Sequence, residues 1–293
     1  MNKQDSDKKH KERLNSILEN SSYRLAYEDT EFMTDENLRG IRLQLELLKP
    51  ESYLRNHHIN STVVVFGSAR ILSPEKAKLA LESLEKQAHC TPDDDKLNSA
   101  ILVARRNLNQ SKYYEEARRF AQIVSKRFQE EGRRDFVVVT GGGPGIMEAG
   151  NRGAFDGSGR SIGFNITLPH EQAPNSFITP GLCFQFRYFG LRKMHFLLRA
   201  VALVVFPGGY GTLDELFEVL TLIQTNKMKQ VPIVLVGTEF WQKAINFSFL
   251  LEEGFINEKD IQLFTIVDTA EEIITTIHNF YDGKPPVKNF DND

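Results

Sequence analysis

The chain has 293 residues, of which 41% are hydrophobic and 26% charged, and its formal net charge at pH 7 is −3. A chain of this length can bury a full core in one large domain or in two modest ones. The ordinary composition indicates a globular protein, and the slightly negative charge argues against the basic surface of a nucleic-acid-binding protein. We therefore expect no nucleic-acid partner.

The remaining compositional features predict a cytoplasmic protein. The two cysteines, Cys90 and Cys183, are far apart and form no CxxC spacing, which favours reduced thiols. The polar N-terminal sequence lacks the apolar core of a secretory signal. No apolar run approaches the roughly 18 residues that a membrane-spanning helix needs, so no membrane partner is expected.

The N-terminal region predicts a tail followed by a helix. Residues 1–30 are polar and rich in charge, which is typical of a mobile tail. From Thr34 to Leu54 apolar residues recur at helical spacing, and this pattern predicts a helix that packs on the main domain. We expect residues 31–293 to form a single nucleotide-binding catalytic domain.

Strand-like and helical segments then alternate along the chain. Short apolar runs predict strands at 62–66, 136–139, 161–168, 202–206, 232–236 and 264–267. Helical patterns lie at 113–131, 146–155, 187–199, 213–224, 240–251 and 270–280. Apolar strands joined by helices predict an α/β fold, namely a Rossmann-like, doubly wound parallel sheet with helices on both faces.

Residues 73–109 interrupt this alternation. They contain two helical runs separated by a turn with the acidic triplet Asp93–Asp95, and they are much longer than a usual connection. We interpret them as a helical insertion. The triplet follows Pro92 and has no partner ligands nearby, so a solvated turn is favoured over a metal site.

Two glycine clusters each follow a predicted strand and precede a predicted helix. The first contains Gly141, Gly142, Gly143 and Gly145; the second contains Gly208, Gly209 and Gly211, followed by Thr212. Glycine lets a ligand approach the backbone closely, and the following helix directs N–H groups at the same place. Because both clusters lie at the carboxyl ends of strands, they predict a phosphate or sugar site.

The spacing of the glycines excludes two common classes of nucleotide site. A dinucleotide fingerprint needs glycine at relative positions 1, 3 and 6, but the sixth position is Ile146 in one cluster and Asp214 in the other. A P-loop needs Gly-Lys-Ser/Thr, which follows neither cluster. NAD binding and ATP hydrolysis are therefore disfavoured, while a mononucleotide or sugar phosphate remains open.

Charged residues near these clusters are candidates for catalysis. Glu215 lies in the first turn of the helix after the second cluster, within reach of whatever that loop binds. Arg192 and Lys193 form a cationic pair on an otherwise apolar helix, which is unusual for a solvated face. No spacing of His, Cys, Asp or Glu predicts a metal site, and no cofactor is expected.

These motifs resemble those of a known family. GGGPGIMEAGNRGA, then Arg192-Lys193, then PGGYGTLDE resemble the signature of the LOG family, the cytokinin riboside 5′-monophosphate phosphoribohydrolases once called lysine decarboxylase-like. The long bacterial form is the more similar one. Phe196 stands where the family pattern has methionine, and the short plant forms lack the insertion.

The resemblance implies an activity and a site. The implied activity is hydrolysis of the N-glycosidic bond of AMP-type nucleotides, with cytokinin nucleotides among the candidate substrates. The products would be the free base and ribose 5-phosphate. The implied catalytic pair is Arg192 and Glu215. The implied substrate contacts are Ser68, Glu171, Lys193, Gly208, Gly209, Gly211 and Thr212. From the first glycine cluster, we also expect Gly142 and Gly143 to contact the substrate. A homodimer, or a multiple of dimers, is also implied.

Three other readings compete with this hydrolase. A non-catalytic mononucleotide sensor would use the same glycine loops and would have Glu215 directed away from the pocket. A pyridoxal-phosphate lysine decarboxylase needs a Schiff-base lysine, for which Lys193 is the candidate near the site. An NAD-linked oxidoreductase conflicts with the glycine spacing. If a second carboxylate assists Glu215, the candidates are Glu148 and Glu171.

Overall fold

The computed structural model describes residues 3–89, 94–129, 134–167 and 173–284. The chain divides into two compact units, Met1–Lys49 and Pro50–Asp293, so the division falls later than residue 30. The first unit holds α1 (Lys3–Leu18), the 3-10 turns η1 (Ser21–Tyr23) and η2 (Glu36–Leu38), α2 (Thr30–Met33) and the start of α3 (Arg39–Asn56). Thr34 does not start the long helix, because its N–H and hydroxyl bond to the carbonyl oxygen of Glu31 and close α2.

The second unit is built on a seven-stranded parallel sheet, with the order β4-β3-β2-β1-β5-β6-β7. The chain extends the sheet from β1 to one edge and then returns to place β5 beside β1, where Val65 pairs with Val204. The expected doubly wound α/β fold is therefore confirmed. The strands are β1 (Thr62–Phe66), β2 (Val137–Thr140), β3 (Ser161–Ile166), β4 (Cys183–Phe186), β5 (Ala200–Val205), β6 (Ile233–Val236) and β7 (Phe264–Val267).

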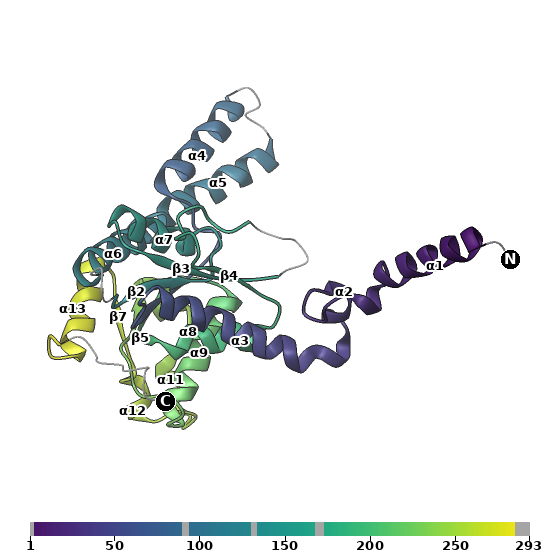
Figure 1. Ribbon diagram of the computed structural model, residues 1–293. Helices are drawn as coiled ribbons and strands as arrows, with labels where there is room; N and C mark the ends of the chain where they lie inside the picture. Colours follow the sequence, from purple (N-terminus) through teal and green to yellow (C-terminus); the bar gives the residue numbers. More distant parts are fainter. Residues whose placement is uncertain (1–2, 90–93, 130–133, 168–172, 285–293) are drawn as a thin grey trace. The chain divides into compact units, whose positions relative to one another are not determined.

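Helices cover both faces of this sheet (Figure 1). Alternate residues of β1 are buried on opposite sides: Val63 and Val65 pack with α6, α7 and α13, whereas Val64 and Phe66 pack with α8 and α9. Burial on both faces explains why the strands are apolar without alternation. The helices are α6 (Lys112–Phe128), α7 (Ile146–Asp156), α8 (Phe189–Leu198), α9 (Tyr210–Gln224) and α13 (Ala270–Phe280).

Residues 73–109 contain two helices that project from the sheet as a hairpin, α4 (Pro74–Ala88) and α5 (Asp95–Gln110) (Figure 1). Of the acidic triplet, Asp93 lies outside the described residues, and the Asp94 side chain caps α5 by accepting bonds from the N–H groups of Lys96 and Leu97. The base of the hairpin contacts α7 through Lys76, whose Nζ lies 3.3 Å from Oε1 of Glu148.

One local expectation was wrong, and one strand was missed. The single helix expected at 240–251 is divided into α10 (Thr238–Ala244) and α11 (Phe247–Glu252), because the Asn246 side chain accepts a bond from the Phe249 N–H and starts a new helix. The short helix α12 (Glu258–Ile261) follows. The edge strand β4 was not expected; its residues alternate between exposed and buried, unlike the continuous apolar runs of the inner strands.

Candidate functional site

A cleft of about 630 Å³ lies at the carboxyl ends of the central strands. Its lining comes from the end of β1 and the loop after it (66–70), from Gly141 and Met147 after β2, from Phe189 and Arg192 of α8, and from residues 209–215 after β5. The strand order reverses between β1 and β5, and doubly wound sheets bind ligands at this reversal. The topology therefore places the cleft where a ligand site is expected.

The second glycine loop contributes an open helix N-terminus to the cleft. Gly209 is the N-cap of α9, and its carbonyl oxygen accepts from the N–H groups of Thr212 and Leu213. The N–H groups of Tyr210 and Gly211 precede the first helical bond and have no partner within the helix. Gly208 allows close packing, since a Cβ there would stand 2.1 Å from Oγ1 of Thr212. Gly208 itself is not among the residues that line the cleft.

The backbone of the first glycine loop forms hydrogen bonds with other parts of the protein. The N–H of Gly142 donates to Oγ1 of Thr140, and its carbonyl oxygen accepts from the backbone and side chain of Asn175. The Gly143 carbonyl accepts from the same side chain, and the first N–H of α7, that of Ile146, donates to the carbonyl of Ser68. Gly142 and Gly143 are not among the residues that line the cleft, whereas Gly141 of this cluster is.

Arg192 reaches the cleft from α8. Its Nε donates to the carbonyl oxygen of Phe164 at 2.8 Å, and its guanidinium lies 5.2 Å from the centre of the Phe196 ring. Burial lowers the pKa of Arg192, and the charge of Glu215 opposes that shift. An arginine remains protonated in proteins, so the cleft has a positioned planar cation.

Glu215 lines the same cleft from the first turn of α9, with 8% of its surface exposed. Burial raises the pKa of this carboxyl to about 7, against the charges of Lys193 and Arg192, which lower it. A group with this pKa can accept a proton near neutral pH and release it again, which is the property of a general base.

Lys193 lies beside Glu215 but is not among the residues that line the cleft. Its Nζ is 2.8 Å from Oδ2 of Asp214, 2.8 Å from Oε2 of Glu218 and 3.6 Å from Oε2 of Glu215. The bonds to Asp214 and Glu218 raise the pKa of Lys193, although burial opposes them. The lysine is therefore a charged residue held by the carboxylates of α9.

Some of the other expected residues line the cleft and others do not. Ser68, Gly209, Gly211 and Thr212 line the cleft. Glu171 lies outside the described residues, and Glu148 does not line the cleft, because its carboxylate accepts from the Tyr114 hydroxyl and contacts Lys76. Phe196 is fully buried beneath Arg192.

Sequence reasoning missed Arg70, Met147 and Phe189. Arg70 lines the cleft with an exposed side chain, and its backbone N–H donates to Oγ of Ser68, which fixes the turn after β1. Phe189 of α8 is 52% exposed, and Met147 lines the same cleft from α7. The available signal for Arg70 was its position two residues after the Gly67-Ser68 turn.

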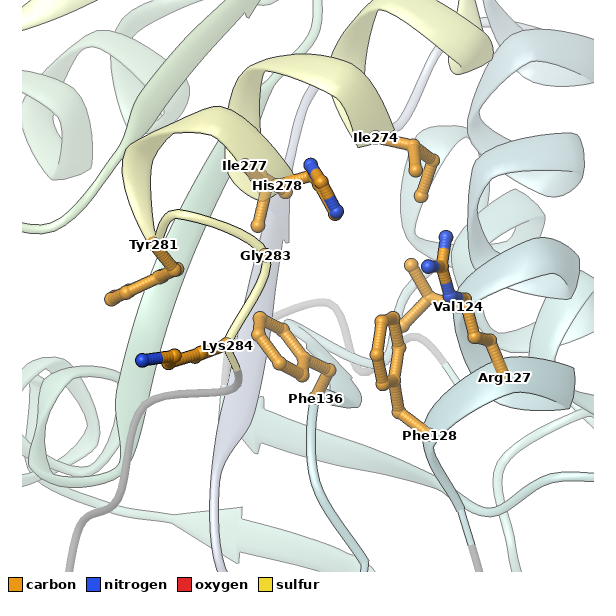
Figure 2. A pocket seen from close by; sticks show the side chains of 10 residues that line it. All are labelled: Val124, Arg127, Phe128, Phe136, Ile274, Ile277, His278, Tyr281, Gly283 and Lys284. Carbon is orange, nitrogen blue, oxygen red and sulfur yellow. The ribbon is translucent and has the colours of Figure 1, made fainter.

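Figure 2 shows a second hollow, of about 40 Å³, between α6, α13 and Phe136. It is too small for a nucleotide, and Phe136 precedes β2, so it lies where strands begin. Its basic side chains include Arg127 and His278 in the last turns of α6 and α13, where a positive charge stabilises the helix end. This hollow is not a candidate for the nucleotide site.

Two further searches cover only the described residues. No group of three or more His, Cys, Asp or Glu side chains in these ranges is arranged to hold a metal ion. Within the same ranges, no helix is long and apolar enough to cross a membrane.

Comparison with known proteins gives a match over residues 147–277 to the family model described as "Possible lysine decarboxylase". The "Cytokinin riboside 5′-monophosphate phosphoribohydrolase LOG4" of Arabidopsis thaliana is 29% identical over 153 residues, which are 50% of this chain and 69% of that protein. A probable phosphoribohydrolase of the same name from Oryza sativa subsp. japonica is 29% identical over 149 residues, with 49% and 63% covered. These matches confirm the resemblance to the LOG family.

Solved structures also resemble this chain in part. The molybdenum cofactor binding protein from Rippkaea orientalis has a TM-score of 0.42 and 18% identity, covering 58% of this chain and 88% of that one. The Moco carrier protein from Chlamydomonas reinhardtii has a TM-score of 0.40 and 18% identity, covering 59% and 89%.

Proposed function

We propose that this chain hydrolyses the N-glycosidic bond of nucleoside 5′-monophosphates, with AMP as the reference substrate, to the free base and ribose 5-phosphate. The observation that carries the proposal is the buried carboxyl of Glu215, whose pKa is raised to about 7, in one cleft with Arg192. The sequence matches to plant phosphoribohydrolases support the same reaction class.

In the proposed reaction, the 5′-phosphate binds at the open N-terminus of α9, near the side chain of Arg70. The C1′–N bond lengthens and positive charge develops on the ribose, as in other glycoside hydrolysis. Glu215 takes a proton from the attacking water while the oxygen bonds to C1′. The base leaves with the electron pair of the broken bond, Arg192 stabilises the negative charge that develops on it, and the base then takes a proton from water. Glu215 releases its own proton to solvent.

The surroundings of Lys193 argue against a pyridoxal-phosphate decarboxylase. A Schiff base forms from a neutral amine in the cofactor pocket, whereas the pKa of Lys193 is raised by its carboxylate partners. Among the described residues that line the cleft there is no lysine. A mononucleotide sensor would not need Glu215 in the cleft, where this side chain lies.

The test is incubation of the purified protein with a panel of nucleoside 5′-monophosphates, followed by chromatographic separation of the products. Free base and ribose 5-phosphate should form in equal amounts, and the Glu215→Gln protein should form almost none. Tight nucleotide binding without any base release from the whole panel would favour the sensor and refute the hydrolase.

We further propose that the protein works in the cytoplasm as a homodimer or a multiple of dimers, as the resemblance to the LOG family implies. Light scattering of the purified chain would give its assembly directly. A panel that includes prenylated adenosine monophosphates would decide whether cytokinin nucleotides are accepted.

A further inference from the structure

Lys193 has an environment that a substrate contact does not explain. Its ammonium has three N–H donors. Two of them face Asp214 and Glu218, each at 2.8 Å, and Glu215 lies 3.6 Å away. The side chain is 17% exposed and is absent from the cleft lining. The lysine therefore lies outside the lining of the cleft and contacts Asp214 and Glu215, which do line it.

We propose that Lys193 is a positioning residue for Glu215 and not a phosphate contact: its ammonium, held by Asp214 and Glu218, fixes the Glu215 carboxylate and favours its charged form. This inference rests on the proposed function, in which Glu215 is the general base. It replaces the role that the family resemblance implies for this lysine.

The charges around Glu215 come from three places. Arg192 and Lys193 on α8 both lower its pKa, whereas Asp214 and Glu218 on α9 raise it. Arg70, in the loop after β1, lines the same cleft and has an exposed side chain. Since burial is the largest influence and favours the neutral acid, the nearby ammonium keeps part of the population ionised at neutral pH.

This arrangement predicts opposite effects for two neutralising substitutions. Lys193→Met removes the positive charge and should raise the pKa of Glu215 by about one unit or more. Glu218→Gln removes a competing carboxylate and frees a donor of Lys193, so the pKa of Glu215 should fall. A residue with a merely structural role would not shift the titration in opposite directions in these two variants.

The experiment measures the titration of Glu215 directly, by carbon-13 NMR of glutamate-labelled protein, with the Glu215→Gln spectrum as the assignment. In parallel, kcat/KM is measured against pH for AMP and for adenosine. Lys243→Met is the matched control, because Lys243 forms an exposed pair with Glu239 at 2.7 Å and is not among the charges that act on Glu215.

The expected result is a higher pKa in Lys193→Met, a lower one in Glu218→Gln and no change in Lys243→Met. The acid limb of kcat/KM should move with the pKa, and Lys193→Met should regain activity as the pH rises. Its loss at pH 7 should be about tenfold and equal for AMP and adenosine. An unchanged titration, or a loss confined to AMP, would overturn the inference and restore a phosphate contact.

The two proposals fail in different ways. If the wild-type protein releases no base from any nucleotide, the proposed hydrolase is wrong, and the NMR titration still decides whether Lys193 controls Glu215. If base is released and the titration does not move, only the role of Lys193 is wrong.

Discussion

The Nε of Arg192 donates a hydrogen bond of 2.8 Å to the carbonyl oxygen of Phe164, so the side chain of a helix is bound to the backbone of β3. The same guanidinium packs on the ring of Phe196 and against Gly141, where a Cβ would stand 2.7 Å from Nη2. A backbone atom, a ring and a glycine thus fix this arginine before any substrate binds.

Arg192→Ala and Glu215→Gln should each lower kcat/KM for AMP by about a hundredfold or more, and the double variant should be little worse than either. Residues that act as one unit lose their effect together. Arg192→Lys should also be poorly active, because lysine keeps the charge but not the planar fork or the Nε bond. Kinetics of the four proteins test this, and strictly additive losses would mean that the two residues do separate work.

Glu215→Gln should stabilise the protein at pH 8 and have little effect on stability at pH 4.5. The folded-state pKa of Glu215 is raised from 4.5 to about 7, so the stability associated with its neutral form is complete below pH 4.5 and is lost as the pH rises through 7. Glutamine does not ionise and so avoids this loss of stability, which is about 3 kcal/mol.

Urea unfolding of both proteins at several pH values measures this difference. Glu239→Gln is the control, because Lys243 lowers the pKa of that exposed carboxyl and no gain at high pH is expected. A Glu215→Gln protein that is equally destabilised at pH 5 and pH 8 would contradict the assigned burial of the acid.

Adenosine should be a very poor substrate beside AMP. Losing two or three charge-assisted contacts of about 1.5–3 kcal/mol each lowers kcat/KM by roughly three orders of magnitude or more, with part of the loss in kcat. Arg70→Ala should reduce the rate with AMP and leave the rate with adenosine unchanged. Arg119→Ala, which removes an exposed arginine paired with Glu271, is the control. Equal cleavage of AMP and adenosine would refute phosphate anchoring.

Gly142→Ala should destabilise the fold strongly, whereas Gly209→Ala should leave stability nearly unchanged. Gly142 has a φ of +75°, and a Cβ there would stand 1.8 Å from Oδ1 of Asn165; Gly209 has no atom within 4 Å of a built Cβ. We expect a loss of about 2 kcal/mol or more for Gly142→Ala. Thermal unfolding of the two variants is the measurement, and equal midpoints would show that the first loop relaxes freely.

The sequence predicted the sheet well because its inner strands are buried on both faces and read as continuous apolar runs. It missed β4, which alternates like a half-exposed edge strand, and it fused α10 with α11 because the cap at Asn246 is a side-chain bond. In the candidate site, the family resemblance predicted Arg192 and Glu215 as the catalytic pair, and both side chains line the cleft. It did not distinguish the two glycine clusters, because the bonds of Asn175 to Gly142 and Gly143 come from a distant segment.

The sequence also did not predict which residues the Lys193 side chain contacts. Asp214 and Glu218 are four residues apart and share one face of α9, but which neighbour this acidic face meets depends on how α8 crosses it. The charge pattern thus predicted a functional role for Lys193, whereas the packing of α8 against α9 determines its carboxylate partners.

The pairing of β1 with β5 also has a consequence for biosynthesis. Ser68 and Gly209 lie on the same cleft, yet the four strands β2 to β5 and a helical hairpin are made between them. The nascent chain therefore has no nucleotide site until α9 has left the ribosome, and closing so long a segment is slow. If the proposed function holds, AMP should raise the thermal stability of the complete chain and have no effect on a chain truncated before β5.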